Sequence, residues 1–229
     1  MANPASDRVP AKVQARVQAR EEGTERRRDP VATKAALLRA AVAEFAAKGL
    51  AGARIDEIAQ RAGVNKQLVY HYFGSKDEIY AAALETVYAE IREREKALHL
   101  GDLPPLAAME RLIGFSFDYL AEHPEFLALL NDENRQDARH IRGSERLEQM
   151  HSPLVSLMQE TIERGAGEGV FRRDLDPVQL YISIAGLSYF FFSNNRTLSA
   201  IFGRALDTPK VVAERRRHII AFAMGALRP

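Results

Sequence analysis

From residue 30 onward, apolar residues recur every three or four positions, and Gly or Pro interrupts the pattern at intervals. This spacing places apolar side chains on one face of a helix, whereas a half-buried strand needs a period of two. No stretch shows a convincing strand pattern, and Ala, Leu, Glu and Arg, which favour helices, are common. The sequence therefore predicts an all-α protein whose core is built from packed helices.

Capping residues and helix breakers set the bounds of the expected helices. Asp29 followed by Pro30 is typical of a helix start, and Gly49 is expected to end that helix. Ser75 with Glu78 forms a capping box at the start of a long fourth helix. The expected helices cover about residues 30–48, 55–62, 66–72, 76–98, 106–121, 125–131, 145–165, 177–196 and 209–226.

Composition excludes some classes of protein and leaves others open. The chain has no cysteine, which excludes disulfides, thiolate metal sites and cysteine nucleophiles. Its most hydrophobic stretch, residues 182–192, is too short and too interrupted by Gly and Ser to span a bilayer, and the N-terminus lacks the apolar segment of a signal peptide. We therefore expect a soluble cytoplasmic protein that needs no metal or cofactor.

Positive charge is concentrated towards the N-terminus. Residues 1–80 hold 14 Lys and Arg against 10 Asp and Glu, whereas the remainder holds 18 against 21. This small difference fits a solvated surface about as well as a nucleic-acid partner. Residues 1–29 end in the basic run Arg26–Arg28 and lack aromatic residues, so they are expected to form a disordered basic arm.

Two short helices flanking the turn Gly63–Asn65 have the pattern of a helix-turn-helix. In this motif the second helix lies in the DNA major groove, with its first residues facing base edges. The outward-facing positions of the second helix are Lys66, Gln67, Tyr70 and His71. Lys can bond guanine, Gln can pair with adenine, and Tyr and His can donate to phosphates. A merely solvated helix face is the alternative.

This region resembles the tetracycline-repressor-like (TetR) regulators from Thr33 to about Leu84. The shared residues are Ala40-Ala41, Phe45 and Gly49, then Ile55-Asp-Glu-Ile58-Ala59 and Ala62-Gly63-Val64, then Val69-Tyr70-His71-Tyr72-Phe73-Gly-Ser75-Lys76-Asp77. The chain departs from the family pattern at Arg54, where a capping Thr is frequent, and at Gln67, where a small residue is usual. Arg54 can contact a phosphate in place of capping the helix.

The resemblance implies DNA-binding roles for residues in and around the second helix of the motif. Tyr70 and Lys76 match positions that contact the DNA backbone, and the residues that match the recognition helix are Asn65, Lys66, Gln67, His71 and Tyr72. Arg54 joins this set of expected DNA-binding residues because it can contact a phosphate. Lys76 fits independently, because its charge and the free N–H groups of a helix N-terminus both attract phosphate. For Tyr70 and Tyr72, core packing is the alternative. Residues 30–76 are thus expected to form the DNA-binding domain.

Residues 77–229 match the family only in helical content and length, which implies a larger effector-binding and dimerisation domain. The segment from His123 to Arg135 resembles stretches in some members. Aromatic residues there and nearby could line an effector pocket, with polar residues supplying specificity. The expected ligand-binding residues are Phe115, Tyr119, Phe126, Asn131, Asn134, Arg135, Tyr189 and Phe190. Ordinary core packing is the alternative for each aromatic residue.

The resemblance assigns homodimerisation to the last two long helices, which carry apolar stripes. The stripes consist of Leu180, Ile184, Leu187 and Phe191 in one helix, and of Val212, Ile219, Phe222 and Ala226 in the other. A two-fold dimer matches the symmetry of a palindromic operator. Packing within one chain must account for part of each stripe.

Catalysis has little support in the sequence. Residues 165–169 look like a phosphate loop but follow a helix and lack the Lys-Ser/Thr ending, and the zinc-deaminase-like His123-Pro-Glu125 has no cysteine partners. Neither Ser116 nor Ser188 has the flanking glycines of a nucleophile elbow. We therefore expect no enzyme. The resemblance implies a transcriptional regulator, most simply a repressor that a small molecule releases from double-stranded, palindromic operator DNA. A DNA-binding dimer without an effector, and activation in place of repression, are the alternatives.

Overall fold

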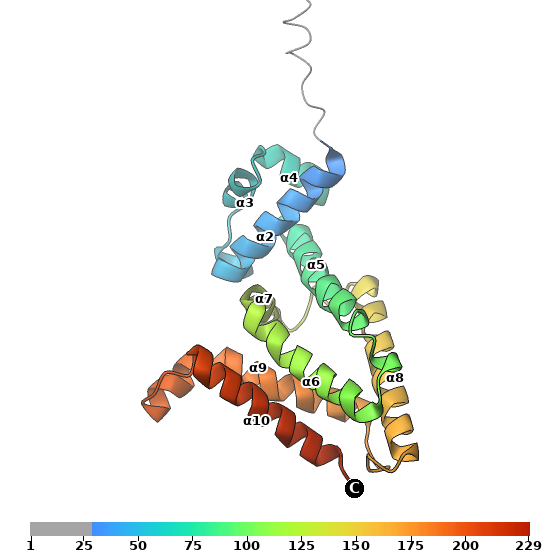
Figure 1. Ribbon diagram of the computed structural model, residues 1–229. Helices are drawn as coiled ribbons and strands as arrows, with labels where there is room; N and C mark the ends of the chain where they lie inside the picture. The colour runs from blue at the N-terminus through green and yellow to red at the C-terminus, as the bar shows by residue number, and fades with distance from the viewer. Residues whose placement is uncertain (1–28) are drawn as a thin grey trace, which may run out of the picture.

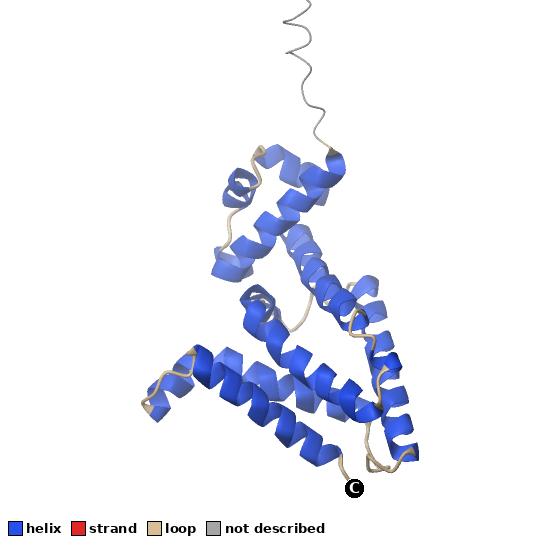
Figure 2. Cartoon of the chain, in the orientation of Figure 1, coloured by secondary structure: helices blue, strands red, loops and turns tan. Residues whose placement is uncertain are grey.

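The computed structural model describes residues 29–229, apart from the side chains of residues 148 and 150–152. Within this part of the chain there is no strand, and the expected all-α fold is confirmed (Figure 2). The basic arm expected before residue 29 lies outside the described residues. The elements are α2 (Pro30–Gly52), α3 (Ile55–Arg61), α4 (Lys66–Phe73), α5 (Lys76–Lys96), η1 (Leu100–Asp102), α6 (Pro105–Glu122), α7 (Pro124–Arg135), α8 (Glu145–Gly167), α9 (Pro177–Phe202) and α10 (Pro209–Leu227).

Three helices begin at the capping residues that the sequence indicates. The side chain of Asp29 accepts a hydrogen bond from a first-turn N–H of α2 at 2.9 Å, and Asn65 does the same for α4 at 2.9 Å. Ser75 caps α5 at 3.1 Å. These bonds satisfy backbone donors that have no partner within the helix. Local chemistry therefore sets where the N-terminal helices start.

Gly49 interrupts α2 with a φ of +66°. A Cβ at this position would lie 2.8 Å from a carboxylate oxygen of Asp132 in α7. Both the positive φ and the close approach favour glycine, because a Cβ makes the first strained and the second a clash. The break at Gly49 thus allows the end of α2 to lie against α7.

Two C-terminal helices are longer than their patterns suggest. Helix α9 continues to Phe202 and ends at Gly203, which has a φ of +63°. Helix α8 continues to Gly167, because Gly165 lies inside the helix with the ring of Phe171 packed directly against it. Gly169, at a φ of +73°, then makes the turn. The glycine run is therefore a helix end and its return turn, as the sequence favoured over a phosphate loop.

Two hydrophobic clusters hold the helices together. The first joins α2, α3 and α4, here called the head, to α5 and α7, with Phe45 and Tyr80 in edge-to-face contact at 5.0 Å. The second joins α6, α8, α9 and α10 around Phe117. Helix α5, whose 21 residues span about 31 Å, runs from the head down to α8 (Figure 1). It therefore connects the head mechanically to the rest of the molecule.

Candidate nucleic-acid interface and ligand cavity

Helices α3 and α4 form the expected helix-turn-helix. Gly63 turns the chain between them with a φ of +69°, and the N–H of Val64 donates to the carbonyl of Ala59 at 3.0 Å. The inner face of α4 buries Val69 and Phe73 against the first cluster. The opposite face of α4 therefore points outward at the end of the molecule remote from α9 and α10 (Figure 1).

The outward face of α4 presents the polar side chains that the sequence indicates. Lys66, Gln67 and His71 are exposed. Tyr70 is 43% exposed, so core packing does not explain it. Tyr72 is half-buried against the first cluster, so packing accounts for part of its surface. One exposed helix face thus combines cationic, amide, phenol and imidazole groups.

The Asp56 carboxylate forms ion pairs with two cationic side chains beside α4. The Lys66 ammonium lies 3.0 Å from a carboxylate oxygen of Asp56, and this hydrogen bond raises the pKa of Lys66. The Arg54 guanidinium lies 3.9 Å from the other oxygen of Asp56 and makes no helix-capping bond. Residues 30–76 contain seven Lys and Arg against three Asp and Glu. The head therefore retains excess positive charge for a polyanion.

Lys76 links the start of α5 to the end of α2. Its ammonium donates to the backbone carbonyl of Ala51 at 3.3 Å. Ser75 caps the same helix end, and Asp77 lies in its first turn. Lys76 is thus fixed beside the helix-turn-helix, where it can exchange a carbonyl partner for a phosphate oxygen.

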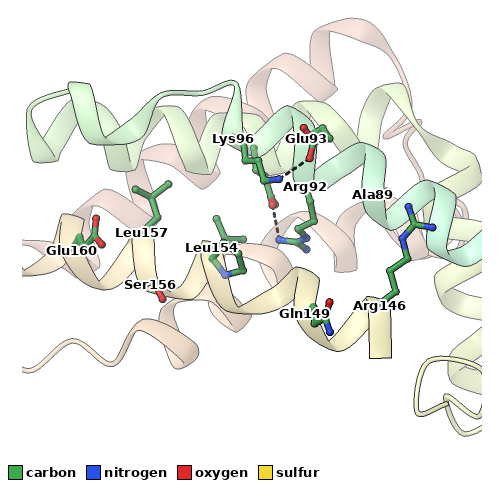
Figure 3. Close-up of a pocket in the computed structure, with 12 residues that line it drawn as sticks. Ala89, Arg92, Glu93, Lys96, Arg146, Gln149, Leu154, Ser156, Leu157 and Glu160 are labelled. Atoms are coloured by element: carbon green, nitrogen blue, oxygen red, sulfur yellow. Dashed lines mark hydrogen bonds and ion pairs between the residues drawn. The ribbon is translucent and has the colours of Figure 1, made fainter. Parts of the chain in front are cut away.

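A cavity of about 650 Å³ lies between α5 and α8 (Figure 3). Its walls combine apolar side chains with charged and amide groups. The lining residues are Ala89, Arg92, Glu93, Glu95, Lys96, Arg146, Gln149, Pro153, Leu154, Ser156, Leu157 and Glu160. Such a mixture suits an organic molecule with an apolar body and a few polar groups.

The α5 wall of this cavity contains a buried ion pair. A guanidinium nitrogen of Arg92 lies 2.5 Å from a carboxylate oxygen of Glu95, and another donates to the hydroxyl of Tyr181 at 3.3 Å. Burial raises the pKa of Glu95 to about 7, although the positive charge of Arg92 acts in the opposite direction. Charges at such a site are costly unless they are well paired, so small changes beside them have large electrostatic effects.

Sequence reasoning missed this cavity, although a signal was present. Arg92 and Glu95 follow the buried residues Leu84 and Tyr88 at helical spacing, which places charged groups on the inward face of α5. An ion pair on an otherwise apolar helix face is unusual and marks a position that deserves a functional explanation.

The eight expected ligand-binding residues do not converge on one cavity. Tyr119 and Phe126 are buried, and their ring centroids lie 5.6 Å apart. The ring centroids of Phe115 and Tyr119 lie 5.7 Å apart, so the three rings form one aromatic packing group. Phe190 is 56% exposed on α9, and Asn134 is exposed on α7. None of the eight lines the cavity between α5 and α8.

The remaining three polar or aromatic members of that set are engaged within the chain. The amide of Asn131 is hydrogen-bonded to the hydroxyl of Tyr189. Arg135 donates to Asp132 at 2.8 Å. Their role as effector contacts stays a prediction, and these bonds show that their polarity has an intramolecular use.

The expected dimer stripes need correction. Leu180, Ile184, Phe191 and Ile219 are buried inside this chain, where Phe191 packs 6.0 Å from Phe117. They face α6 and α8 and cannot meet a second copy. Leu187 and Val212 are half-buried against the same cluster, whereas Phe222 and Ala226 are exposed. The apolar residues that α9 exposes are instead Val178, Ile182, Phe190, Ile201 and Phe202.

Two features are absent from the residues that the structure describes: a membrane-spanning helix and a metal-binding cluster. Among the helices of residues 29–229, none is long and apolar enough to cross a membrane. The same residues contain no group of three or more His, Asp or Glu side chains arranged to bind a metal ion.

Comparison with known proteins identifies the family. Residues 37–83 match the model of bacterial regulatory proteins of the tetR family, and residues 105–222 match the tetracyclin repressor-like C-terminal domain. The chain is 35% identical over 196 residues to the HTH-type transcriptional repressor NicS of Pseudomonas putida, which covers 86% of this chain and 92% of NicS. It is 49% identical over 105 residues to the HTH-type transcriptional repressor SCO4008 of Streptomyces coelicolor, but spans only 50% of that relative.

A solved structure gives the same assignment of fold. The ketosteroid transcriptional regulator KstR2 of Mycobacterium tuberculosis superposes with a TM-score of 0.63 at 22% identity, covering 84% of this chain and 93% of that one. The chain belongs to the TetR family, as the sequence resemblance indicated. It is a DNA-binding transcriptional regulator.

Proposed function

We propose that this regulator is a repressor that binds a palindromic operator as a homodimer and leaves it when a small molecule enters the cavity between α5 and α8. One observation carries this proposal: a single helix, α5, bears Lys76 beside the helix-turn-helix and Arg92 and Glu95 on the cavity wall. A ligand that displaces α5 therefore displaces the head. Operator binding requires action in the cytoplasm, and the proposal includes no catalytic step.

The mechanism follows from the geometry of DNA. Two recognition helices read successive major grooves on one face only when they are about 34–36 Å apart, or a multiple of this distance. A small tilt of α5 in each protomer changes that separation. A ligand shifts the equilibrium only by its preference for the non-binding arrangement, and operator DNA must weaken ligand binding by the same factor.

Within the DNA-binding surface we assign different roles to different side chains. Lys66 and Gln67 at the start of α4 face base edges, with Asn65 capping the helix beside them. Tyr70 and Lys76 contact phosphates. Arg54, His71 and the exposed edge of Tyr72 complete the surface.

Replacing Lys76 by alanine should weaken binding to all DNA sequences alike. Removal of one phosphate contact from each protomer removes about two released counterions per bound dimer, so the slope of log K against log salt should become less steep by about 2. Salt titrations with the operator and with a random duplex measure both effects. An unchanged slope would show that Lys76 does not contact the DNA backbone.

Replacing Gln67 by alanine should instead relax sequence preference at one base pair in each half-site. Loss of a bidentate amide–adenine contact costs about 1–3 kcal/mol of discrimination. Competition among operators that vary singly at each position locates the affected base pair. If the variant keeps the full preference everywhere, Gln67 does not read a base.

The exposed faces of α9 and α10 support the proposed dimer. Ile182 and Phe190 of α9 and Phe222 of α10 are each at least 55% exposed. Gly186 and Gly225 lie on exposed helix positions with open space around their Cα atoms, so a second copy can approach the backbone closely there. A four-helix arrangement of α9 and α10 from two protomers would cover these apolar residues.

A screen for compounds that release the operator tests the effector role. An active compound should bind with lower affinity in the presence of operator DNA, which calorimetry measures directly. Its effect should disappear in Ala89→Trp, whose indole projects from the α5 wall and obstructs the cavity, while operator binding without compound is retained. Release that survives in this variant would place the effector elsewhere. Equal ligand affinity with and without operator would favour a DNA-binding dimer that does not sense that compound.

A further inference from the structure

Three consecutive residues of α7 bond to three different parts of the chain. We call Asn131, Asp132 and Glu133 the α7 junction. The amide of Asn131 accepts a hydrogen bond from Tyr189 of α9 and donates to the hydroxyl of Ser193 at 3.4 Å. The junction therefore begins with a polar connection to the helix that we assign to the dimer interface.

The second residue connects α7 to the head. The Asp132 carboxylate is buried and accepts hydrogen bonds from the backbone N–H of Leu50 in α2 at 2.7 Å and from the hydroxyl of Tyr80 in α5 at 3.1 Å. Burial raises the pKa of Asp132, but bonds from Arg135, Leu50 and Tyr80 outweigh it and hold the pKa below its usual range. The charged Asp132 carboxylate thus binds the backbone of α2 immediately after the break at Gly49.

The third residue holds the loop after α7 against α5. Glu133 is fully buried and accepts hydrogen bonds from the backbone N–H groups of His140 at 2.7 Å and Ile141 at 3.2 Å. The His140 ring lies 2.8 Å from Glu133 on one side and 3.2 Å from Asp77 on the other. Asp77 follows Lys76 in the first turn of α5. The junction therefore contacts the head at α2 and also the start of α5, which follows the head in the chain.

We infer that Asp132 is a positioning residue for operator binding: through it the α7 junction fixes the angle of each head relative to α9. This inference rests on the proposed function. The head packs on both α5 and α7 through the first hydrophobic cluster, and apolar packing is non-directional. The hydrogen bond from Leu50 to Asp132 adds a directional contact, which fixes the orientation of the end of α2 on α7. The polar segment that the sequence suggested for effector contacts thus sets the relative placement of the two heads.

Asp132→Asn in the full-length protein tests this inference, because it retains the side-chain shape and removes the charge. Hydrogen bonds to a charged acceptor are stronger than those to a neutral amide, so the variant should hold the head less firmly. Affinity for the optimally spaced palindrome should therefore fall about tenfold. Affinity for a single half-site should change less than about threefold, since the helix-turn-helix itself is intact. The preference among palindromes whose half-sites are moved apart or together by one or two base pairs should flatten.

The matched control is Asp118→Asn, which removes an ion pair with Arg216 between α6 and α10, at 2.7 Å, without touching the head. It should leave the spacing preference unchanged.

Tyr80→Phe removes one hydrogen-bond donor to Asp132 and should flatten the spacing preference in the same direction by less. If Asp132→Asn does not fold, the spacing preference of Tyr80→Phe tests the inference in its place. An unaltered spacing preference in the folded variants overturns the inference. A wild-type protein that binds no palindrome would instead overturn the proposed function.

Discussion

Replacing Ile182 by glutamate is expected to separate the dimer and abolish specific binding to the operator. Ile182 is 55% exposed in the second turn of α9, on the helix face that also exposes Val178. In a two-fold dimer the substitution places two carboxylates in the interface, and each uncompensated buried charge costs about 3–5 kcal/mol. The dimer dissociation constant should therefore rise roughly ten-thousand-fold or more. Sedimentation velocity and fluorescence anisotropy with labelled operator measure the two effects.

Leu106→Glu provides the control for this prediction. Leu106 is a 37% exposed apolar residue on α6, outside the two helices of the proposed interface. The same change of charge there should leave the dimer and operator affinity intact. If Ile182→Glu also remains dimeric with unchanged affinity, the exposed face of α9 is not the interface.

The largest loss of stability is expected from Gly165→Val. A Cβ at Gly165 would lie 2.1 Å from the ring of Phe171, whose side chain is 1% exposed. Because the added atoms cannot share this space, the Phe171 ring must leave the second cluster. Loss of a buried phenylalanine from a core costs about 3–5 kcal/mol in the free energy of unfolding. Chemical denaturation monitored by circular dichroism measures the difference.

Gly167→Val is the matched substitution two residues along the same helix. No side chain lies within 4 Å of a Cβ at Gly167, so only helix propensity should change, by less than about 1 kcal/mol. Equal unfolding free energies for the two variants would contradict the packing role assigned to Gly165.

The head could be predicted from sequence because local chemistry determines it. Asn65 and Ser75 satisfy backbone donors within their own first turns, and Gly63 supplies the positive φ that the turn needs. The exposed face of α4 then follows from helical spacing alone. Only the half-buried position of Tyr72 depended on packing that spacing does not reveal.

Several residues of the expected dimer stripes are buried within this chain, and the sequence could not show which ones, because α9 is apolar on more than one side. Leu180 and Ile184 form one stripe, and Val178 and Ile182 form another two residues earlier. Periodicity shows that both stripes exist, but only the packing of α6 and α8 decides which of them is covered. The inward-facing stripe fills the core of this chain, and the other stripe is exposed.

The interpretation of Asn131 and Arg135 as effector contacts illustrates a related limit. A polar residue beside an apolar helix stripe has the same sequence signature whether it binds a ligand or another part of the chain. Long-range partners such as Leu50 and Tyr189 become known only when the fold brings them to α7. The same reasoning explains why the cavity between α5 and α8 was missed.

Selection of bound duplexes from a random pool by the 229-residue protein tests whether it is a dimeric, operator-binding repressor. We expect enrichment of a palindrome whose half-sites lie about one helical turn, or a multiple of it, apart. The Lys76→Ala variant should select the same palindrome with lower affinity, and the Gln67→Ala variant should select one relaxed at a single position in each half-site. Enrichment of no sequence, or of a site without two-fold symmetry, would contradict the proposal that this protein is a dimeric, operator-binding repressor.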